Sequence, residues 1–155
     1  MKFFEQSFKV NCSIDKVWKF YTDIKHLEII TPPDLKLQII ETSNKQIVEG
    51  LRMTISGRLV LYNSKWNSTI SLVDITKHMY IDEMVHGPFK KWKHIHLFSD
   101  IGKNQSVVTD KIEFELPFFF LGKLMEGYVE SNLKKIFEFR KIQTVKILSE
   151  KSADE

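Results

Sequence analysis

The sequence predicts a single α+β domain in which a curved antiparallel sheet of about seven strands packs against one long C-terminal helix. Apolar residues recur at helical spacing after a first strand, alternate with polar residues through the middle of the chain, and return to helical spacing near its end. The chain of 155 residues has the length of one domain and no internal repeat. We expect this domain to cover residues 1–148 and the mostly polar residues 149–155 to form a flexible tail.

The first predicted elements are a strand at residues 2–10 and two short helices that follow it. Ser13 is a residue type that favours the N-cap of a helix, and apolar residues at helical spacing come after it. Pro32 and Pro33 forbid continuation of the helix, so the helical stretch ends by about Ile30.

Residues 35–116 follow the period of two that is typical of half-buried antiparallel strands. Turn signals at 86–89 and 100–105 separate consecutive strands. A helix then spans about residues 121–148, roughly 42 Å at 1.5 Å per residue. Gly127 lies inside this helix and indicates either a close approach of another segment or a bend. Only this helix is large enough to cover the sheet, and a curved sheet around one helix commonly leaves a space.

Composition and charge argue against several classes of function. A net charge of +3 is too small for a dedicated nucleic-acid-binding protein. Cys12 is the only cysteine, so neither an intrachain disulfide nor a thiolate metal cluster can form. The longest apolar run, at 116–121, is too short to span a bilayer, and the N-terminus lacks a signal-peptide core. We therefore expect a cytoplasmic protein without stable membrane insertion.

Two histidines on one predicted strand form the main candidate site. Trp92, His94 and His96 share one face of this strand, and lysines occupy the other face, which should point to solvent. The next strand turns Asp110 inward, and a turn near residues 102–103 places it opposite one of the two histidines. The sequence thus predicts a buried or half-buried cluster of two imidazoles and one carboxylate.

Three interpretations of this His94, His96 and Asp110 cluster are open. The histidines could bind a metal with the carboxylate as third ligand. One histidine could act as a general base that Asp110 orients. Alternatively, both histidines are satisfied by Asp110 or water and anchor the polar end of a ligand. The sequence contains no evident fourth metal ligand, nucleophile motif or Gly-rich phosphate loop. This favours the last interpretation, and we expect neither a metal nor a cofactor in the site.

Three stretches of the sequence resemble the SRPBCC superfamily: GPFKKWKHIHLF (87–98), TDKIEFELP (109–117) and LGKL (121–124). This superfamily contains StAR-related lipid-transfer domains, birch-pollen-allergen-like proteins and polyketide cyclase/dehydrase-like proteins, and the chain is most similar to its small stand-alone prokaryotic members. The resemblance implies a helix-grip fold, with a seven-stranded sheet around a long helix and a deep hydrophobic cavity between them. Members bind hydrophobic ligands, and a minority are enzymes.

We therefore expect a protein that binds or carries a hydrophobic or aromatic small molecule, such as a lipid, a polyketide or an isoprenoid-like compound. The alternative is a cyclase- or hydrolase-like enzyme that uses His94, His96 and Asp110. A phenylalanine run at 118–120 indicates either a plug over the core or a lip at the cavity mouth, which could touch a membrane transiently.

The expected ligand-binding residues come from the inner faces of the strands and from the long helix. One residue of the pair Asp82–Glu83 must point inward, and a two-residue turn at 87–88 favours Glu83. The complete expected set is Met53, Ile55, Leu59, Trp66, Glu83, Trp92, His94, His96, Phe98, Asp110, Ile112, Phe114, Leu124, Met125 and Tyr128.

Overall fold

The computed structural model describes residues 1–58, 62–117 and 119–153, with side chains except at 119–124 and 150–153. Within these ranges, seven strands form one antiparallel sheet in the order β1-β7-β6-β5-β4-β3-β2. The strands are β1 (Lys2–Val10), β2 (Gln38–Thr42), β3 (Arg52–Gly57), β4 (Ser64–Asp74), β5 (Met79–His86), β6 (Lys91–Gly102) and β7 (Gln105–Glu115). The helices are α1 (Ile14–Thr22), α2 (Lys25–Ile29), the short 3-10 helix η1 (Pro33–Leu35) and α3 (Phe119–Ala153).

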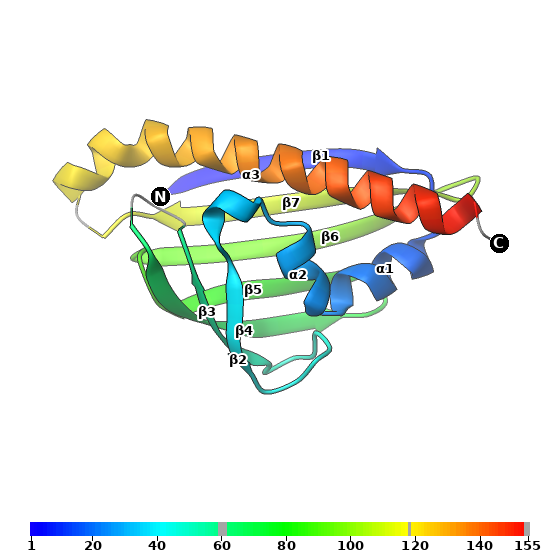
Figure 1. Ribbon diagram of the computed structural model, residues 1–155, viewed down its shortest axis with the longest axis horizontal. Coiled ribbons are helices and arrows are strands. Elements are labelled where there is room, and N and C mark those ends of the chain that lie inside the picture. The colour runs from blue at the N-terminus through cyan, green and yellow to red at the C-terminus, as the bar shows by residue number, and fades with distance from the viewer. Residues whose placement is uncertain (59–61, 118, 154–155) are drawn as a thin grey trace.

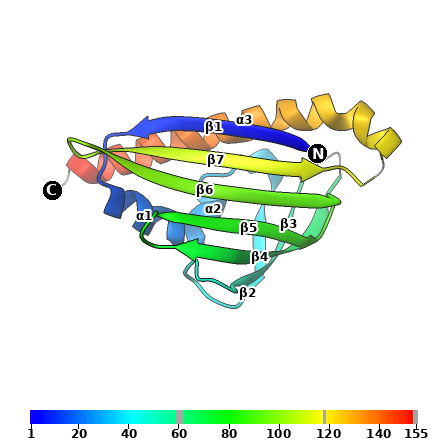
Figure 2. The ribbon, with the colours of Figure 1, turned by 180° about the vertical axis from the view of Figure 1, so that it is seen from behind.

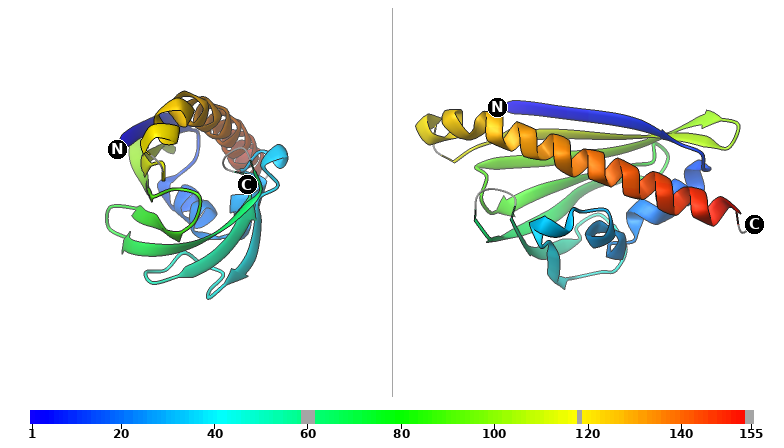
Figure 3. Two further views of the ribbon diagram at one scale, coloured as in Figure 1. Left: turned by 90° about the vertical axis from the view of Figure 1, so that its left-hand side faces the viewer. Right: turned by 45° about the horizontal axis from the view of Figure 1, so that its top comes forward.

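The sheet curves around α3, which runs along its inner face (Figure 1). Helices α1 and α2 lie on the same side of the sheet, and the opposite view shows the outer face of the strands uncovered by any helix (Figure 2). Seen end-on, the strands curl into an open trough with α3 along its upper edge (Figure 3). The predicted α+β class, the seven-stranded antiparallel sheet, the two short helices after β1 and the long C-terminal helix are all confirmed.

The strand that the sequence predicts from Leu35 begins later, and this prediction is wrong for residues 35–37. Pro33 opens a 3-10 turn that includes Leu35, because its fixed φ suits the first position of a helical turn. Lys36 then adopts a left-handed conformation with φ of 48°, and β2 begins at Gln38. Consequently Leu35 and Leu37 leave the sheet and turn toward the space between sheet and helices.

A polar layer separates two apolar clusters along the inner face of the sheet. On β6, Trp92 belongs to the cluster that packs under the first half of α3, and Phe98 belongs to the cluster near α1. His94 and His96 lie between these two aromatic residues and are buried. On β7, Asp110 occupies the same layer between apolar neighbours. The alternation of both strands therefore places the three polar residues in the middle of the core.

Helix α3 spans 35 residues, which corresponds to about 52 Å. It begins two residues before the predicted start and continues through residues 149–153, which the sequence assigned to a tail. No helix among the described residues, α3 included, is long and apolar enough to cross a membrane. Gly127 is exposed, and no atom lies within 4 Å of the position that a Cβ would take there, so a close approach does not explain this glycine.

We expect Gly127→Ala to raise the free energy of unfolding by about 1 kcal/mol, because alanine loses less backbone entropy in a helix and the space is open. Chemical denaturation measures this change. Gly87→Ala is the contrasting case: its Cβ would overlap the side chains of Met84 and Trp66, so stability should fall. A destabilised Gly127→Ala protein would contradict the open space around this position.

Candidate functional site

A cavity lies between the inner face of the sheet and the helices α2 and α3. The centres of water molecules can occupy about 110 Å³ of it, whereas a single buried water needs only about 10–15 Å³. Its walls are mainly apolar, and polar groups gather on one side. The strands contribute Met53, Ile55, Trp66, Ile70, Tyr80, Asp82, Met84, Trp92, His94 and His96, and α3 contributes Leu133, Ile136, Phe137 and Arg140.

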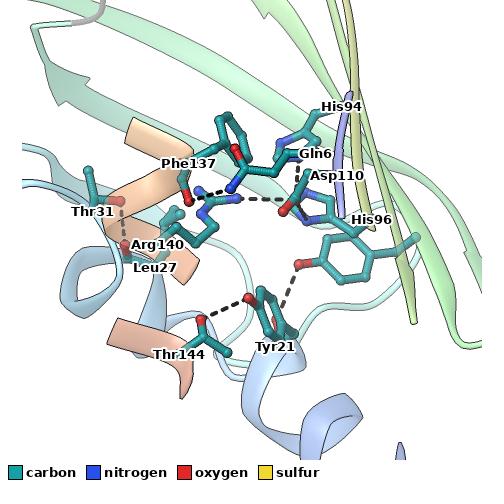
Figure 4. Close-up of polar contacts among 11 residues, drawn as sticks. Gln6, Tyr21, Leu27, Thr31, His94, His96, Asp110, Phe137, Arg140 and Thr144 are labelled. Atoms are coloured by element: carbon teal, nitrogen blue, oxygen red, sulfur yellow. Dashed lines mark hydrogen bonds and ion pairs between the residues drawn. The ribbon is translucent and has the colours of Figure 1, made fainter. Parts of the chain in front are cut away.

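Asp110 is the centre of the polar cluster beside this cavity (Figure 4). Its register partner on β6 is His96, one of the two histidines that the predicted turn allowed. His94 donates a hydrogen bond from Nε2 to Asp110 Oδ1 over 2.7 Å. His96 Nδ1 lies 3.3 Å from the same oxygen, and Arg140 Nη1 donates to it from α3 over 3.4 Å. One carboxylate therefore joins two strands to the long helix.

Burial and mutual contact set the charges of this cluster. Burial alone would raise the pKa of Asp110, but the hydrogen bond from His94, the close imidazole of His96 and the charge of Arg140 hold it well below its usual range. Burial lowers the pKa of His94, and burial together with the neighbouring His94 lowers that of His96 to about 3. Near neutral pH both imidazoles are uncharged, whereas Asp110 and Arg140 form an ion pair.

Two tyrosines extend the polar region toward α1. Tyr80 stacks on His96 with ring centroids 4.1 Å apart, and its hydroxyl donates to the backbone oxygen of Tyr21 over 3.3 Å. The Tyr21 hydroxyl is 2.9 Å from that of Thr144 on α3. Burial raises the pKa of both phenols, so these groups stay protonated and act as hydrogen-bonding groups in the cavity wall.

Asp82, rather than Glu83, faces the cavity, so the preference for Glu83 is wrong. Asp82 pairs with His94 across β5 and β6, which places it on the inner face, and Glu83 pairs with Lys93 on the outer face. The connection between these strands uses residues 87–90 and not a two-residue turn, which shifts the register by one position.

Solved structures with the same architecture cover nearly the whole chain, although no protein-family model and no curated protein sequence matches it. A point mutant of norcoclaurine synthase from Thalictrum flavum, in complex with a transition-state analogue, is 16% identical, with a TM-score of 0.70 over 92% of this chain and 94% of that one. A START superfamily protein from Mycobacterium smegmatis is 11% identical, with a TM-score of 0.70 over 96% and 97% of the two chains. The di-domain ARO/CYC BexL from the BE-7585A biosynthetic pathway is 13% identical, with a TM-score of 0.69 over 93% of this chain and 46% of that one.

The chain has the helix-grip fold of these solved structures, which is the fold type of SRPBCC proteins. This confirms the fold that the resemblance implied. At identities below one fifth, the likeness covers the fold and leaves the activity of this chain to be argued from its own residues.

The predicted ligand-binding residues fall into three groups within this SRPBCC fold. Six of them line the cavity: Met53, Ile55, Trp66, Trp92, His94 and His96. Four are buried on the inner face without lining it: Phe98, Asp110, Ile112 and Phe114.

The remaining predicted residues lie elsewhere. Tyr128 is 43% exposed, and Met125 packs against the apolar cluster under the first half of α3. This half of α3 packs against the sheet through Val129, so the cavity begins farther along the helix, at Leu133. Leu59 and the side chains of Leu124 and the 118–120 run lie outside the described residues.

Arg140 is the functional candidate that the sequence analysis missed. A base in the later part of a helix complements the helix dipole, which accounts for Arg140 without a functional role. However, it follows Leu133 and Ile136 at helical spacing, on the stripe that faces the sheet, and only 6% of it is exposed. This spacing was the signal that could have identified it.

The three predicted metal ligands do come together, with their ligand atoms within 4.8 Å of one another. However, Asp110 Oδ1 already accepts hydrogen bonds from His94 and Arg140. A guanidinium at this distance opposes a divalent cation, because like charges repel strongly where water is excluded. The arrangement therefore suits a hydrogen-bonded cluster better than a metal centre.

Acid should destabilise the protein through its buried histidines. An unfolded histidine binds a proton below about pH 6.5, whereas the pKa of His96 in the folded protein is about 3, so stability is lost as the pH falls through this window. His96→Phe keeps a ring against Tyr80 and removes this titration. In His96→Phe, the slope of the unfolding free energy against pH should be smaller than in the wild type by about 1.4 kcal/mol per pH unit.

Chemical denaturation at a series of pH values between 4 and 7 measures this slope, and the same substitution at the exposed His86 is the control. Asp82 has the opposite effect on stability: because its pKa in the folded protein is raised to about 6, the unfolding free energy increases as the pH falls from about 6 to the ordinary pKa of an aspartate. This contribution is the same in all three proteins. Equal slopes for the wild type and His96→Phe would contradict the neutral, buried state of His96.

Proposed function

We propose that the protein binds and carries a hydrophobic or aromatic small molecule in the cavity between its sheet and α3. The observation that carries this proposal is the cavity itself, with mainly apolar walls and one buried polar cluster at its side. Apolar surface supplies affinity at about 25 cal/mol per Å² removed from water. A few fixed polar groups then orient one end of the ligand, as in most small-molecule sites.

The cavity walls suit an aromatic or branched apolar body. Met53 and Ile55 on β3 and Ile70 on β4 supply aliphatic contacts. Trp66 and Trp92 offer aromatic faces that can stack on a ring. The SRPBCC fold supports this proposal, since one of its solved representatives is in complex with a transition-state analogue. Lipids, polyketides and isoprenoid-like compounds remain the proposed ligand classes, and a cytoplasmic location without a cofactor stays a prediction.

Filling the cavity should abolish binding of an apolar probe. The neutral dye N-phenyl-1-naphthylamine should bind the wild type with a blue shift of its fluorescence. Ile136→Trp places extra volume in the cavity and should weaken binding at least about tenfold. The matched control is Ile142→Trp on the same helix, because Ile142 is 54% exposed and lies outside the cavity lining.

Circular dichroism checks that Ile136→Trp folds, since overpacking a core costs about 1–3 kcal/mol. Leu37→Trp fills the cavity from the opposite wall and provides an independent test. Undiminished dye binding in both folded variants would refute the proposed binding site. Native mass spectrometry of protein purified from its host can then identify a co-purifying ligand.

One observation favours a cyclase- or hydrolase-like enzyme as the second candidate. His94 borders the cavity, is neutral near pH 7 and is oriented by an ionised carboxylate at 2.7 Å, which is the arrangement of a general base. The described residues near it include no nucleophilic cysteine or serine in the cavity lining. For this reason the carrier function is the better supported of the two.

Replacing His94 and His96 by glutamine separates the two functions. A carrier should keep its dye affinity within about threefold, because apolar contacts supply most of the binding. A metabolite extract of the host, incubated with wild type or variant, should give the same mass spectrum. Masses that change with the wild type alone, while dye binding is equal, would favour the enzyme.

A further inference from the structure

Asp82 is an acidic group in the cavity wall that the polar cluster does not use. On the inner face of the sheet it lies between Ile70 of β4 and His94 of β6. The hydroxyl of Ser68 forms a hydrogen bond with its carboxyl group. Oδ1 of Asp82 is buried, and it has no hydrogen-bond partner among the described residues. A buried carboxylate oxygen without a partner is costly, so its presence calls for an explanation.

The charges in the cavity wall do not balance without a ligand. Asp110 is matched by Arg140, which donates to it over 3.4 Å. Asp23 also borders the cavity, but Lys25 pairs with it at 2.9 Å. The imidazoles of His94 and His96 are uncharged near neutral pH, and the third imidazole of the wall, His26, is hydrogen-bonded to the backbone oxygen of Phe20. The carboxylate of Asp82 therefore remains as one negative charge without a matching cation in the described cavity wall.

We propose that the ligand of this cavity carries a protonated amine that binds against Asp82, with its aromatic or apolar body along β3 and β4. This inference rests on the proposed binding function and narrows its ligand class. An ammonium group supplies both the missing hydrogen-bond donor and the missing positive charge. A hydroxyl would supply the donor alone. A carboxylate or phosphate would be repelled by the negative charge of Asp82. Arg140 could not compensate this repulsion, because it is already paired with Asp110.

The titration of Asp82 agrees with this assignment. Burial and, to a smaller extent, Glu83 on the same strand raise its pKa to about 6, against the lowering effects of the Ser68 hydroxyl and Arg140. His94 faces it from β6 and is neutral in this range. Asp82 is therefore ionised at pH 7.5 and ready to pair with a cation. Amine binding should weaken as the pH falls below 6.

Three small probes of similar shape test the charge preference: phenethylamine, 2-phenylethanol and 3-phenylpropionate. Each is titrated at pH 7.5 against bound N-phenyl-1-naphthylamine, and its dissociation constant is obtained from displacement of the dye. In the wild type, phenethylamine should bind at least about tenfold more tightly than 2-phenylethanol, since charge-assisted hydrogen bonds are the stronger ones. 3-Phenylpropionate should bind most weakly.

Asp82→Asn preserves the shape of the side chain and removes its charge, so it should abolish the preference for the amine and leave the affinity for 2-phenylethanol within about threefold. The matched control is Glu83→Gln, which removes a charge from the outer face one residue away and should keep the preference. Thermal unfolding confirms that both variants fold.

The possible outcomes separate this inference from the proposed function. An amine preference that survives in Asp82→Asn, or tightest binding of 3-phenylpropionate, would overturn the assignment of Asp82 while the binding function stands. Equal affinities of amine and alcohol in the wild type would do the same. Failure of all three probes and of the dye to enter the cavity would refute both.

Discussion

The carboxylate of Asp110 is the interaction on which the arrangement of sheet, helix and cavity depends. It accepts hydrogen bonds from His94 on β6 and from Arg140 on α3, and so joins the β6–β7 hairpin to the C-terminal helix. A buried ion pair of this kind adds little net stability relative to apolar packing, but removal of one partner leaves an uncompensated buried charge. We infer that its main effect is to fix where α3 crosses the sheet.

This polar layer also explains why the cavity persists beside it. The first half of α3 packs directly on Phe89, Trp92 and Phe114, and a second apolar cluster closes the core near α1. Between these clusters, buried polar groups such as Arg140 Nε and Asp110 Oδ2 lack partners among the described residues. Complete collapse onto apolar side chains would leave such groups desolvated at a cost of about 1–3 kcal/mol each. A hydrated or liganded space avoids this cost.

Sequence patterns predict the features that depend on residues close together in the chain. They do not predict features of the structure that depend on contacts with a distant segment. The alternation on β6 and β7 and the short turn between them were enough to place Asp110 opposite one of the two histidines, and in the structure it pairs with His96. Arg140 was missed because a base near the end of a helix is accounted for by the helix dipole, although it continues the apolar stripe of Leu133 and Ile136. Likewise, the sheet register at Asp82 depends on how residues 87–90 fold against other strands. The point at which α3 separates from the sheet also depends on tertiary packing, which no short sequence pattern encodes.

The loop at residues 87–90 therefore controls the chemistry of the cavity without being part of it. Gly87 packs so closely on Met84 and Trp66 that even a methyl group would overlap them. This close packing accompanies the register that pairs Asp82 with His94. A shift by one residue would move every side chain of β5 to the opposite face and exchange Asp82 for the longer Glu83. Both residues are acidic, but the carboxylate of Glu83 stands one methylene farther from the backbone, so the register decides how far the negative charge reaches into the cavity.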